Sequence, residues 1–322
     1  MSRRGWALFG LMAVVWGLPY LLIRVAVDEI TPPAVVLVRV GLATVLLVPV
    51  CLVRGARTVL LPALRRWRPL LVYSVVEIAV PWLLLTHAET RLTSSLSGIL
   101  VAATALVAAL LSWAVGTADR PDLRRSLGLV VGFAGVVTLL GLDLGHVSWL
   151  AVLEVGGTVV CYAVGPMLLT RHLADLPAIG VVTASVAVTA VIYLPVVLLG
   201  PPVGWSHLTA GGIGSLLGLA VVCTALAFVA FFALIAEVGP TRATLITYVN
   251  PAVALLLGVT VLGEPVTLGM ALGFPLVLVG CGLAAAPSRR AVREAAPARA
   301  ELPATALPTV VALDPDPEPE RC

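Results

Sequence analysis

Apolar stretches of roughly eighteen or more residues recur along almost the whole chain, and this feature constrains the fold most. A helix that crosses a bilayer needs about 20 consecutive apolar residues, whereas the core of a soluble domain needs no runs of that length. The composition agrees, because 60% of the 322 residues are hydrophobic and only 11% are charged. We therefore predict an all-α integral membrane protein.

The hydropathy pattern predicts ten transmembrane helices joined by short connections. The expected spans are 5–27, 34–53, 69–86, 93–115, 126–142, 148–170, 177–199, 210–236, 243–262 and 266–285. The N-terminal stretch MSRRGWALFGLMAVVWG begins like a signal peptide. Its apolar run continues past Pro19 without a small-residue cleavage site, so we interpret it as the first span.

The arginines predict the orientation of these spans. All 20 basic residues are arginine. If the N-terminus is inside, the inner loops hold most of them, and the outer loops hold only Arg24 and Arg91. The positive-inside rule then places both termini in the cytoplasm and the protein in the cell membrane. Residues 287–322, rich in Pro, Ala and Glu, are expected to form a disordered cytoplasmic tail.

The two halves of the chain resemble each other. LGLVVGFAG (127–135) matches LGMALGFPL (268–276), HAETRLTSS (87–95) matches IAEVGPTRA (235–243), and PYLLIR (19–24) matches PMLLTR (166–171). Because five helices are an odd number, the second copy must enter the membrane from the opposite side. We predict two inverted five-helix repeats, 1–145 and 146–286, which is the arrangement that alternating access requires.

Two motifs also carry a family resemblance. WGLPY (16–20) and TYVNPAVALLLGVTVLGEPVTLGMALGF (247–274) resemble EamA-type members of the drug/metabolite transporter superfamily. The resemblance covers about residues 6 to 285 and implies ten helices, a central cavity between the halves, and export or uptake of small metabolites. The first half departs from the pattern, since Ala103 and Val115-Gly116 stand where the second has Pro251 and Gly263-Glu264.

Glu77 is the strongest candidate for a functional residue. It lies in the third expected span, roughly 12 Å into the membrane at the helical rise per residue. Its counterpart in the second half, at an offset of 148 residues, is Ala225. An intramembrane carboxylate costs roughly 2.5–3.5 kcal/mol on insertion scales and therefore indicates a substrate or ion pathway. The alternative is a carboxyl group that only holds two helices together.

Arg39 in the second span has no match in the other half and is the natural partner of Glu77. If the two pair, Glu77 stays ionised and the pair can act as a gate. If they do not pair, burial favours the protonated acid and makes Glu77 a candidate proton carrier. Arg39 could instead extend to the outer interface. The sequence leaves these alternatives open.

Prolines and aromatic residues complete the predicted substrate and coupling site. Pro81 cannot donate to the carbonyl of Glu77, and Pro251 likewise frees the carbonyl of Thr247 beside Asn250. Such breaks are tolerated where the freed groups face protein or a wet cavity, although simple kinks explain many of them. The aromatic candidates are Trp16, Tyr20, Trp82, Tyr162 and Tyr248, for which packing or an interface belt is the alternative.

Small-residue faces predict close helix packing. Gly128, Gly132 and Gly135 in the fifth span are mirrored by Gly269 and Gly273 in the tenth. Such faces serve contacts within a subunit or in a homodimer. Glu264 and Glu154, near the outer span ends, are expected to be solvated or to cap helices.

These features predict a secondary transporter that moves a small metabolite, an amino acid or a drug-like compound by alternating access. Export coupled to protons through Glu77 is one form of this hypothesis. No metal site, cofactor or nucleic-acid partner is expected; the expected partners are a small-molecule substrate and membrane lipid. The alternative is a membrane-embedded enzyme acting on a lipid, which the lack of a paired-aspartate cluster on a span disfavours. We therefore expect no enzymatic activity.

Overall fold

Helices make up nearly all of the computed structural model, which describes residues 1–116, 122–142 and 148–284. Within these ranges the chain forms no strand, so the expected all-α fold is confirmed. The tail predicted to be disordered, 287–322, lies outside the described residues.

The helices fall into two halves along the chain. Those of the first half are α1 (Arg3–Val27), α2 (Pro32–Val53), α3 (Ala56–Val59), α4 (Leu61–Arg65), α5 (Trp67–Ser74), the π-helix η1 (Val75–Ala79), α6 (Val80–Ala88), α7 (Ser94–Val101), α8 (Thr104–Ala114) and α9 (Leu123–Gly141). Those of the second half are α10 (Trp149–His172), α11 (Ala178–Leu198), the 3-10 turn η2 (Trp205–His207), α12 (Ala210–Leu217), the π-helix η3 (Gly218–Leu226), α13 (Ala227–Val238), α14 (Pro240–Ala243), α15 (Ile246–Leu262) and α16 (Leu268–Ala284).

Each range predicted to span the membrane contains helix, but the structure differs from the prediction in length and continuity. In the described residues, eight helical stretches are long and apolar enough to cross a membrane, and α15 and α16 are shorter apolar helices. The fourth stretch, Ser94–Ala114, is interrupted by a turn at Ala102–Ala103 between α7 and α8. The span expected at 243–262 begins only at Ile246, because the preceding residues form the separate α14.

The outer surface of the helices is apolar. Large apolar residues such as Leu153, Val137 and Val191 are exposed, at 70%, 69% and 71% of their surface. A surface of this kind is stable where the surrounding solvent is lipid hydrocarbon. The exposed apolar side chains therefore form the lipid-facing surface of a multi-pass membrane protein.

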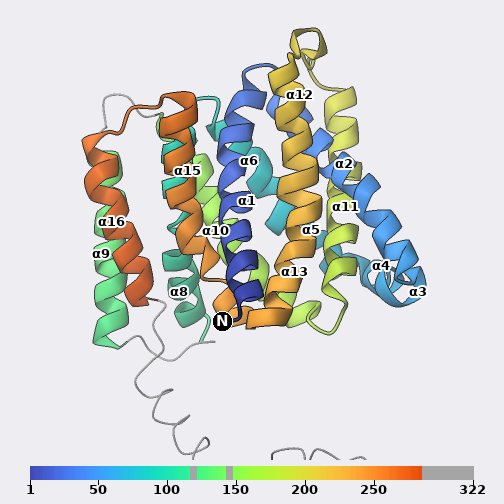
Figure 1. Cartoon of the computed structure of the whole chain (residues 1–322), viewed down its shortest axis with the longest axis horizontal. Helices are drawn as coiled ribbons and strands as arrows, with labels where there is room; N and C mark the ends of the chain where they lie inside the picture. The colour runs from blue at the N-terminus through green and yellow to red at the C-terminus, as the bar shows by residue number, and fades with distance from the viewer. Residues whose placement is uncertain (117–121, 143–147, 285–322) are drawn as a thin grey trace, which may run out of the picture. The chain divides into compact units, whose positions relative to one another are not determined.

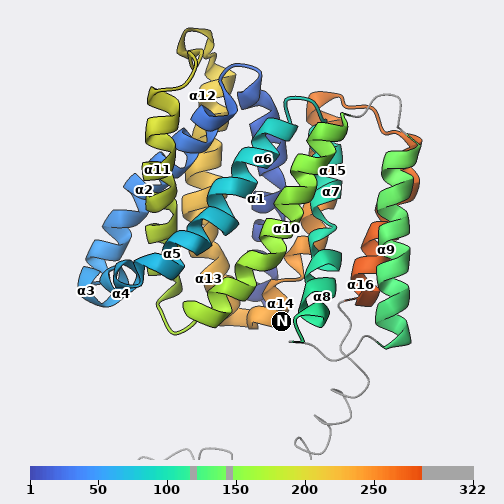
Figure 2. The same cartoon turned by 180° about the vertical axis from the view of Figure 1, so that it is seen from behind.

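The two halves pack against each other through several pairs of helices in the described residues. α1 contacts α15, α2 contacts α11, and α6 contacts α10, while α9 and α16 form a pair at one edge of the bundle (Figures 1 and 2). α1 begins and α16 ends at the same end of the bundle, drawn lower in Figure 1. We call this the lower end and the opposite one the upper end.

Both π-helices occupy corresponding places in the two halves. An offset of 148 residues carries η1, Val75–Ala79, onto 223–227, which overlaps η3, Gly218–Leu226. In the first half the wide turn directly precedes Pro81, which has no N–H to donate. In the second half the helical stretch Ala210–Val238 around η3 contains no proline, and the hydroxyl of Thr224 donates to the carbonyl of Leu219 at 2.8 Å. Such π segments occur frequently at functional sites.

The predicted glycine faces meet inside the chain. A β-carbon at Gly135 in α9 would lie 2.7 Å from the backbone N of Val277 and 2.9 Å from the carbonyl O of Gly273, both in α16. Gly280 of α16 likewise lies against the backbone of Gly132. These glycines therefore allow the backbones of α9 and α16 to touch, and a homodimer would need a different surface.

We expect Gly135→Ala to destabilise the protein, because the added methyl group meets backbone atoms that cannot rotate away. The cost of such overpacking is about 1–3 kcal/mol. Gly141→Ala is the matched control on the same helix, since a β-carbon there meets no atom within 4 Å. Thermal unfolding in detergent should give a lower melting temperature for Gly135→Ala alone. Equal melting temperatures would contradict the close contact of α9 and α16.

Candidate functional site

A buried arginine lies at the contact between the two halves. The Arg39 side chain on α2 is only 8% exposed, and its Nε donates to the Thr224 hydroxyl in η3 at 3.0 Å. Its guanidinium carbon lies 3.6 Å from the ring centroid of Trp82 on α6, in a cation–π contact. The same Thr224 hydroxyl donates onward to the carbonyl of Leu219. Arg39 is therefore held by η3 on one side and α6 on the other.

Two tyrosines complete the surroundings of Arg39. Tyr20 on α1 and Tyr162 on α10 both lie within reach of the Arg39 charge and of each other. Tyr20 is 8% exposed and Trp82 is 7% exposed. We call Tyr20, Arg39, Trp82, Tyr162 and Thr224 the central group. Its members come from five elements of both halves, so the site depends on how the halves pack together.

Arg39 and Glu77 do not pair. The ion pairs of the described residues join other side chains, and none contains either residue. Glu77 projects from η1 towards Gly165 of α10, where a methyl group would overlap with its carboxylate oxygen. That oxygen, Oε2, is buried and has no hydrogen-bond partner among the described residues. Tyr162 lies close to both charged side chains.

The second half donates hydrogen bonds to two carbonyl groups around Pro81. The Tyr193 hydroxyl of α11 donates to the carbonyl of Ala79 at 2.9 Å, at the end of η1. The Thr158 hydroxyl of α10 donates to the carbonyl of Pro81 at 3.2 Å. The wide turn around Glu77 is therefore fixed from both sides by helices of the other half.

The remaining predicted residues lie outside the central group. Trp16 packs against Phe228 and Phe231 of α13. Tyr248 packs beside the apolar cluster formed by α8 and α16. The Asn250 side chain, oriented so that its amide nitrogen donates, bonds the carbonyls of Ile246 and Ala13 at 2.9 and 3.1 Å. Asn250 thereby ties α15 to α1, directly beside the buried Pro251.

Two carboxylates of the upper end cap helices of the opposite half. Glu264, after α15, accepts hydrogen bonds from the backbone N–H groups of Ser94 and Ser95 at 2.7 and 2.9 Å, at the start of α7. Glu29, after α1, accepts from the N–H and the hydroxyl of Thr209 at 2.8 and 2.6 Å, at the start of α12. The Thr209 hydroxyl, more than its N–H, lowers the pKa of Glu29 below its usual value. Glu264 thus caps a helix, one of the roles expected for it.

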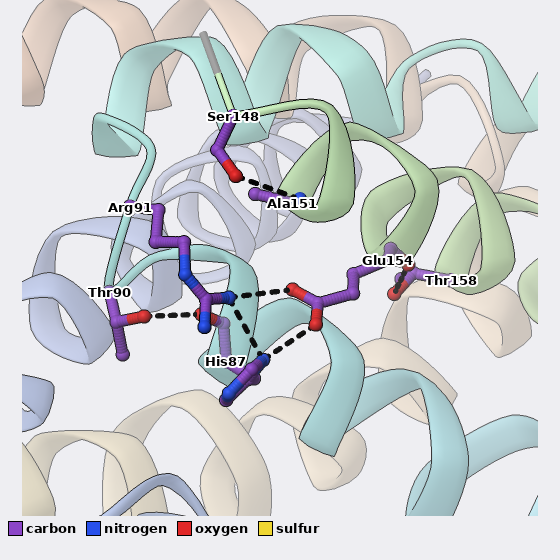
Figure 3. Close-up of polar contacts among 7 residues, drawn as sticks. All are labelled: His87, Thr90, Arg91, Ser148, Ala151, Glu154 and Thr158. Carbon is purple, nitrogen blue, oxygen red and sulfur yellow. Dashed lines mark hydrogen bonds and ion pairs between the residues drawn. The ribbon is translucent and has the colours of Figure 1, made fainter.

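A third link at the upper end joins α6 to α10. Figure 3 shows Glu154 of α10 reaching His87 and Arg91, which lie at and beyond the end of α6. The Nδ1 atom of His87 lies 2.6 Å from Glu154 Oε1, and an Arg91 Nη1 atom lies 3.7 Å from Oε2. His87 and Arg91 are more than a third exposed, so this link lies at the rim of the bundle.

Each of two links at the lower end has a counterpart at the upper end, formed by the corresponding elements of the other half. Arg66 at the start of α5 forms a bidentate pair with Asp175, which follows α10, with both distances 2.7 Å. The Arg66–Asp175 pair corresponds to the upper-end bonds of Glu29 with Thr209, because Glu29 follows α1 and Thr209 lies at the start of α12. The Ser2 hydroxyl at the start of α1 donates to Glu237 at the end of α13. It corresponds to the bond of Glu154 near the start of α10 with His87.

The sequence alone did not point to Thr224 or Gly165. Thr224 belongs to an apolar stretch and gains its role only because η3 turns its hydroxyl towards Arg39. Gly165 accommodates Glu77 only because α10 crosses η1 at that residue. A cavity of about 270 Å³ elsewhere, lined by Arg54, Ile179, Val229, Phe232 and Ala233, includes no member of the central group.

We expect Glu264→Ala to lower stability by about 1 kcal/mol or more, the usual cost of removing a helix cap. The start of α7 would then lose an acceptor for two N–H groups and the Ser95 hydroxyl. Glu264→Gln retains one acceptor oxygen and should lose less. Thermal unfolding of the three proteins in detergent measures the order. Equal stability of all three would contradict the capping role.

Comparisons with known proteins agree with this architecture. The model of the EamA-like transporter family matches residues 4–141 and again residues 149–286. One solved structure, described simply as the crystal structure of a protein, superimposes with a TM-score of 0.64. It covers 91% of this chain and 99% of its own, at 18% identity, and so shows a likeness of fold alone.

Two curated relatives are similar over most of their length. YedA of Escherichia coli (strain K12), named as an uncharacterized inner membrane transporter, is 30% identical over 299 residues, covering 89% of this chain and 93% of that protein. YvbV of Bacillus subtilis (strain 168), named as an uncharacterized transporter, is 24% identical over 272 residues, covering 84% and 88%. Both family matches and both relatives extend across the two halves, and the chain belongs to the EamA-like transporter family.

Proposed function

We propose that the protein is a secondary transporter that moves a small metabolite, an amino acid or a drug-like compound across the cytoplasmic membrane by alternating access. Its family and its relatives support membrane transport in general. Proteins of this family are in general transporters and not enzymes. The substrate, the mechanism and the coupling are our inference from the residues described above.

The central group carries this proposal. Among the described residues, an arginine with no carboxylate partner lies between the halves, and an acid with an unpartnered oxygen lies nearby. Groups of this kind are costly inside a membrane and are retained where they serve a pathway. Arg39 offers a positive charge for an anionic or carboxylate group of the substrate, and Tyr20, Trp82 and Tyr162 offer aromatic surfaces beside it. The substrate would bind where both halves contact it.

The proposed mechanism uses ten transmembrane helices in two inverted repeats. Its support is that α1 begins at the lower end, whereas α10, the first helix of the second half, begins at the upper end (Figures 1 and 2). The links at the two ends come from matching places in the halves. Exposed ion pairs such as Arg66–Asp175 contribute only about 0.2–1 kcal/mol. The links at either end could therefore break and reform as the halves rock.

We propose that the lower end faces the cytoplasm, so that both termini are cytoplasmic. The support is the distribution of arginines. Residues 54–68, from the end of α2 to the first turn of α5, carry five of them: Arg54, Arg57, Arg65, Arg66 and Arg68. The positive-inside rule favours the cytoplasmic side for such a loop.

An untargeted comparison of metabolites in medium and cells, with and without overexpression, tests transport and identifies the substrate. We expect at least one compound to accumulate or disappear, and Arg39→Gln to abolish most of that change because the central cation is lost. Arg57→Gln is the control, since Arg57 is exposed on α3. If overexpression changes no compound, or Arg39→Gln transports as well as the unchanged protein, the proposal is wrong.

Proton coupling through Glu77 predicts that Glu77→Gln uncouples transport from the proton gradient. Glutamine keeps the shape of the side chain at Gly165 but cannot release a proton. The compound found above would be measured in proteoliposomes with and without an imposed pH difference. Transport by Glu77→Gln should be insensitive to that difference. Unchanged proton dependence of the variant would rule out this role.

A further inference from the structure

A second acid, Glu89, is more deeply buried than Glu77. It directly follows α6 at the upper end, and its side chain is 0% exposed. Neither carboxylate oxygen has a hydrogen-bond partner among the described residues. The hydroxyls of Ser94 and Ser97 on α7 are also buried and have no hydrogen-bond partner in the described part of the chain. Such groups call for an explanation, because buried polar atoms are nearly always hydrogen-bonded.

The fold itself does not require this buried acid. The match between HAETRLTSS and IAEVGPTRA makes Glu237 the counterpart of Glu89 in the second half. Glu237 is exposed and accepts a hydrogen bond from the Ser2 hydroxyl. The carboxylates of Glu29 and Glu264 at the upper end likewise have partners, at helix starts. Glu89 alone among these four is enclosed with both oxygens unpartnered.

The charges around Glu89 do not form an ion pair with it. Four charged or titratable side chains are close enough to interact electrostatically with Glu89. They are Tyr20 and Arg24 on α1, Arg39 on α2, and Glu264 after α15. Arg24 pairs with Asp28 at 2.6 Å, Arg39 is held by Thr224 and Trp82, and Glu264 adds negative charge. An ionised carboxylate that is buried and unpaired costs several kcal/mol, so the neutral acid is the form that this enclosure favours.

We propose that Glu89 is a proton-binding site of the transport cycle, protonated while the upper end is closed and able to exchange its proton with water when that end opens. This rests on the proposed transport function but adds a site distinct from Glu77. On opening, the O–H bond of the carboxylic acid breaks, the proton passes to water, and a hydrated carboxylate remains. Glu264 lies close enough to Glu89 for its charge to act on it, and it bonds Ser94 and Ser95 at the start of α7. In this proposal, loss of those bonds is the step that admits water to Glu89.

Infrared spectroscopy of the full-length protein in lipid vesicles tests whether Glu89 holds a proton. A protonated carboxylic acid has a C=O stretching band separate from those of carboxylates. We expect Glu89→Gln to remove, at neutral pH, a band intensity equivalent to one carboxylic acid per chain. Glu237→Gln is the matched control from the other half and should leave that intensity unchanged. An unchanged band in Glu89→Gln would overturn the proposal.

A second variant covers the case in which Glu89→Gln does not fold. Glu89→Asp keeps an acid in the same enclosure, so the band should shift in position and remain present. A band that does not move assigns the proton to another residue and refutes the site. Glu77→Gln, measured in parallel, identifies any separate contribution from Glu77.

Transfer of the vesicles to heavy water tests the gate. Exchange of the Glu89 proton for deuterium shifts its band, and we expect exchange to be several-fold faster in Glu264→Ala than in the unchanged protein. Equal exchange rates would refute the closure by Glu264. These readouts require no transported compound. A chain that moves no metabolite therefore refutes the proposed function, whereas an unchanged band refutes the Glu89 site, and the two failures are distinct.

Discussion

Polar groups within the helices must find their partners inside the protein, because lipid hydrocarbon offers none. This constraint governs how the two halves meet. Arg39 of the first half bonds Thr224 of the second, and Tyr193 and Thr158 of the second bond carbonyls around Pro81 of the first. Apolar packing holds the helices together, whereas these bonds fix the register in which the halves pack.

The same constraint explains the two wide helical turns. A π segment can leave a carbonyl group without its usual helical donor, and such a group is tolerated in a membrane where another group of the protein supplies one. η1 obtains a donor from α11, and in η3 a hydroxyl of the segment itself bonds the carbonyl of Leu219. The turns occur where each half contributes to the central group. Irregular backbone and charged side chains therefore coincide at one level of the bundle.

Much of the fold could be predicted from the sequence, because the length of apolar stretches and the spacing of motifs are properties of local sequence. The helical spans, the glycine faces and the family resemblance are of this kind. The grouping of Tyr20, Arg39, Trp82 and Tyr162 was only partly accessible: their residue types made them candidates, whereas Trp16, Tyr248 and Asn250 are of similar types and pack elsewhere. Which side of a helix faces a partner depends on long-range packing. Thr224 and Gly165 were missed for that reason, since nothing local distinguishes them from lipid-facing or packing residues.

The contact of α9 with α16 also has a consequence for how the chain is made. The two helices begin at Leu123 and Leu268, which are 145 residues apart (268 − 123). At synthesis rates of about 5–20 residues per second, α9 waits roughly 7–30 s for its partner. During that interval the glycine face of α9 is in contact with lipid or with the insertion machinery. The close backbone contact of α9 with α16 is thus among the last to form, and a chain truncated before Leu268 would retain α9 without the partner that Gly128 and Gly135 contact.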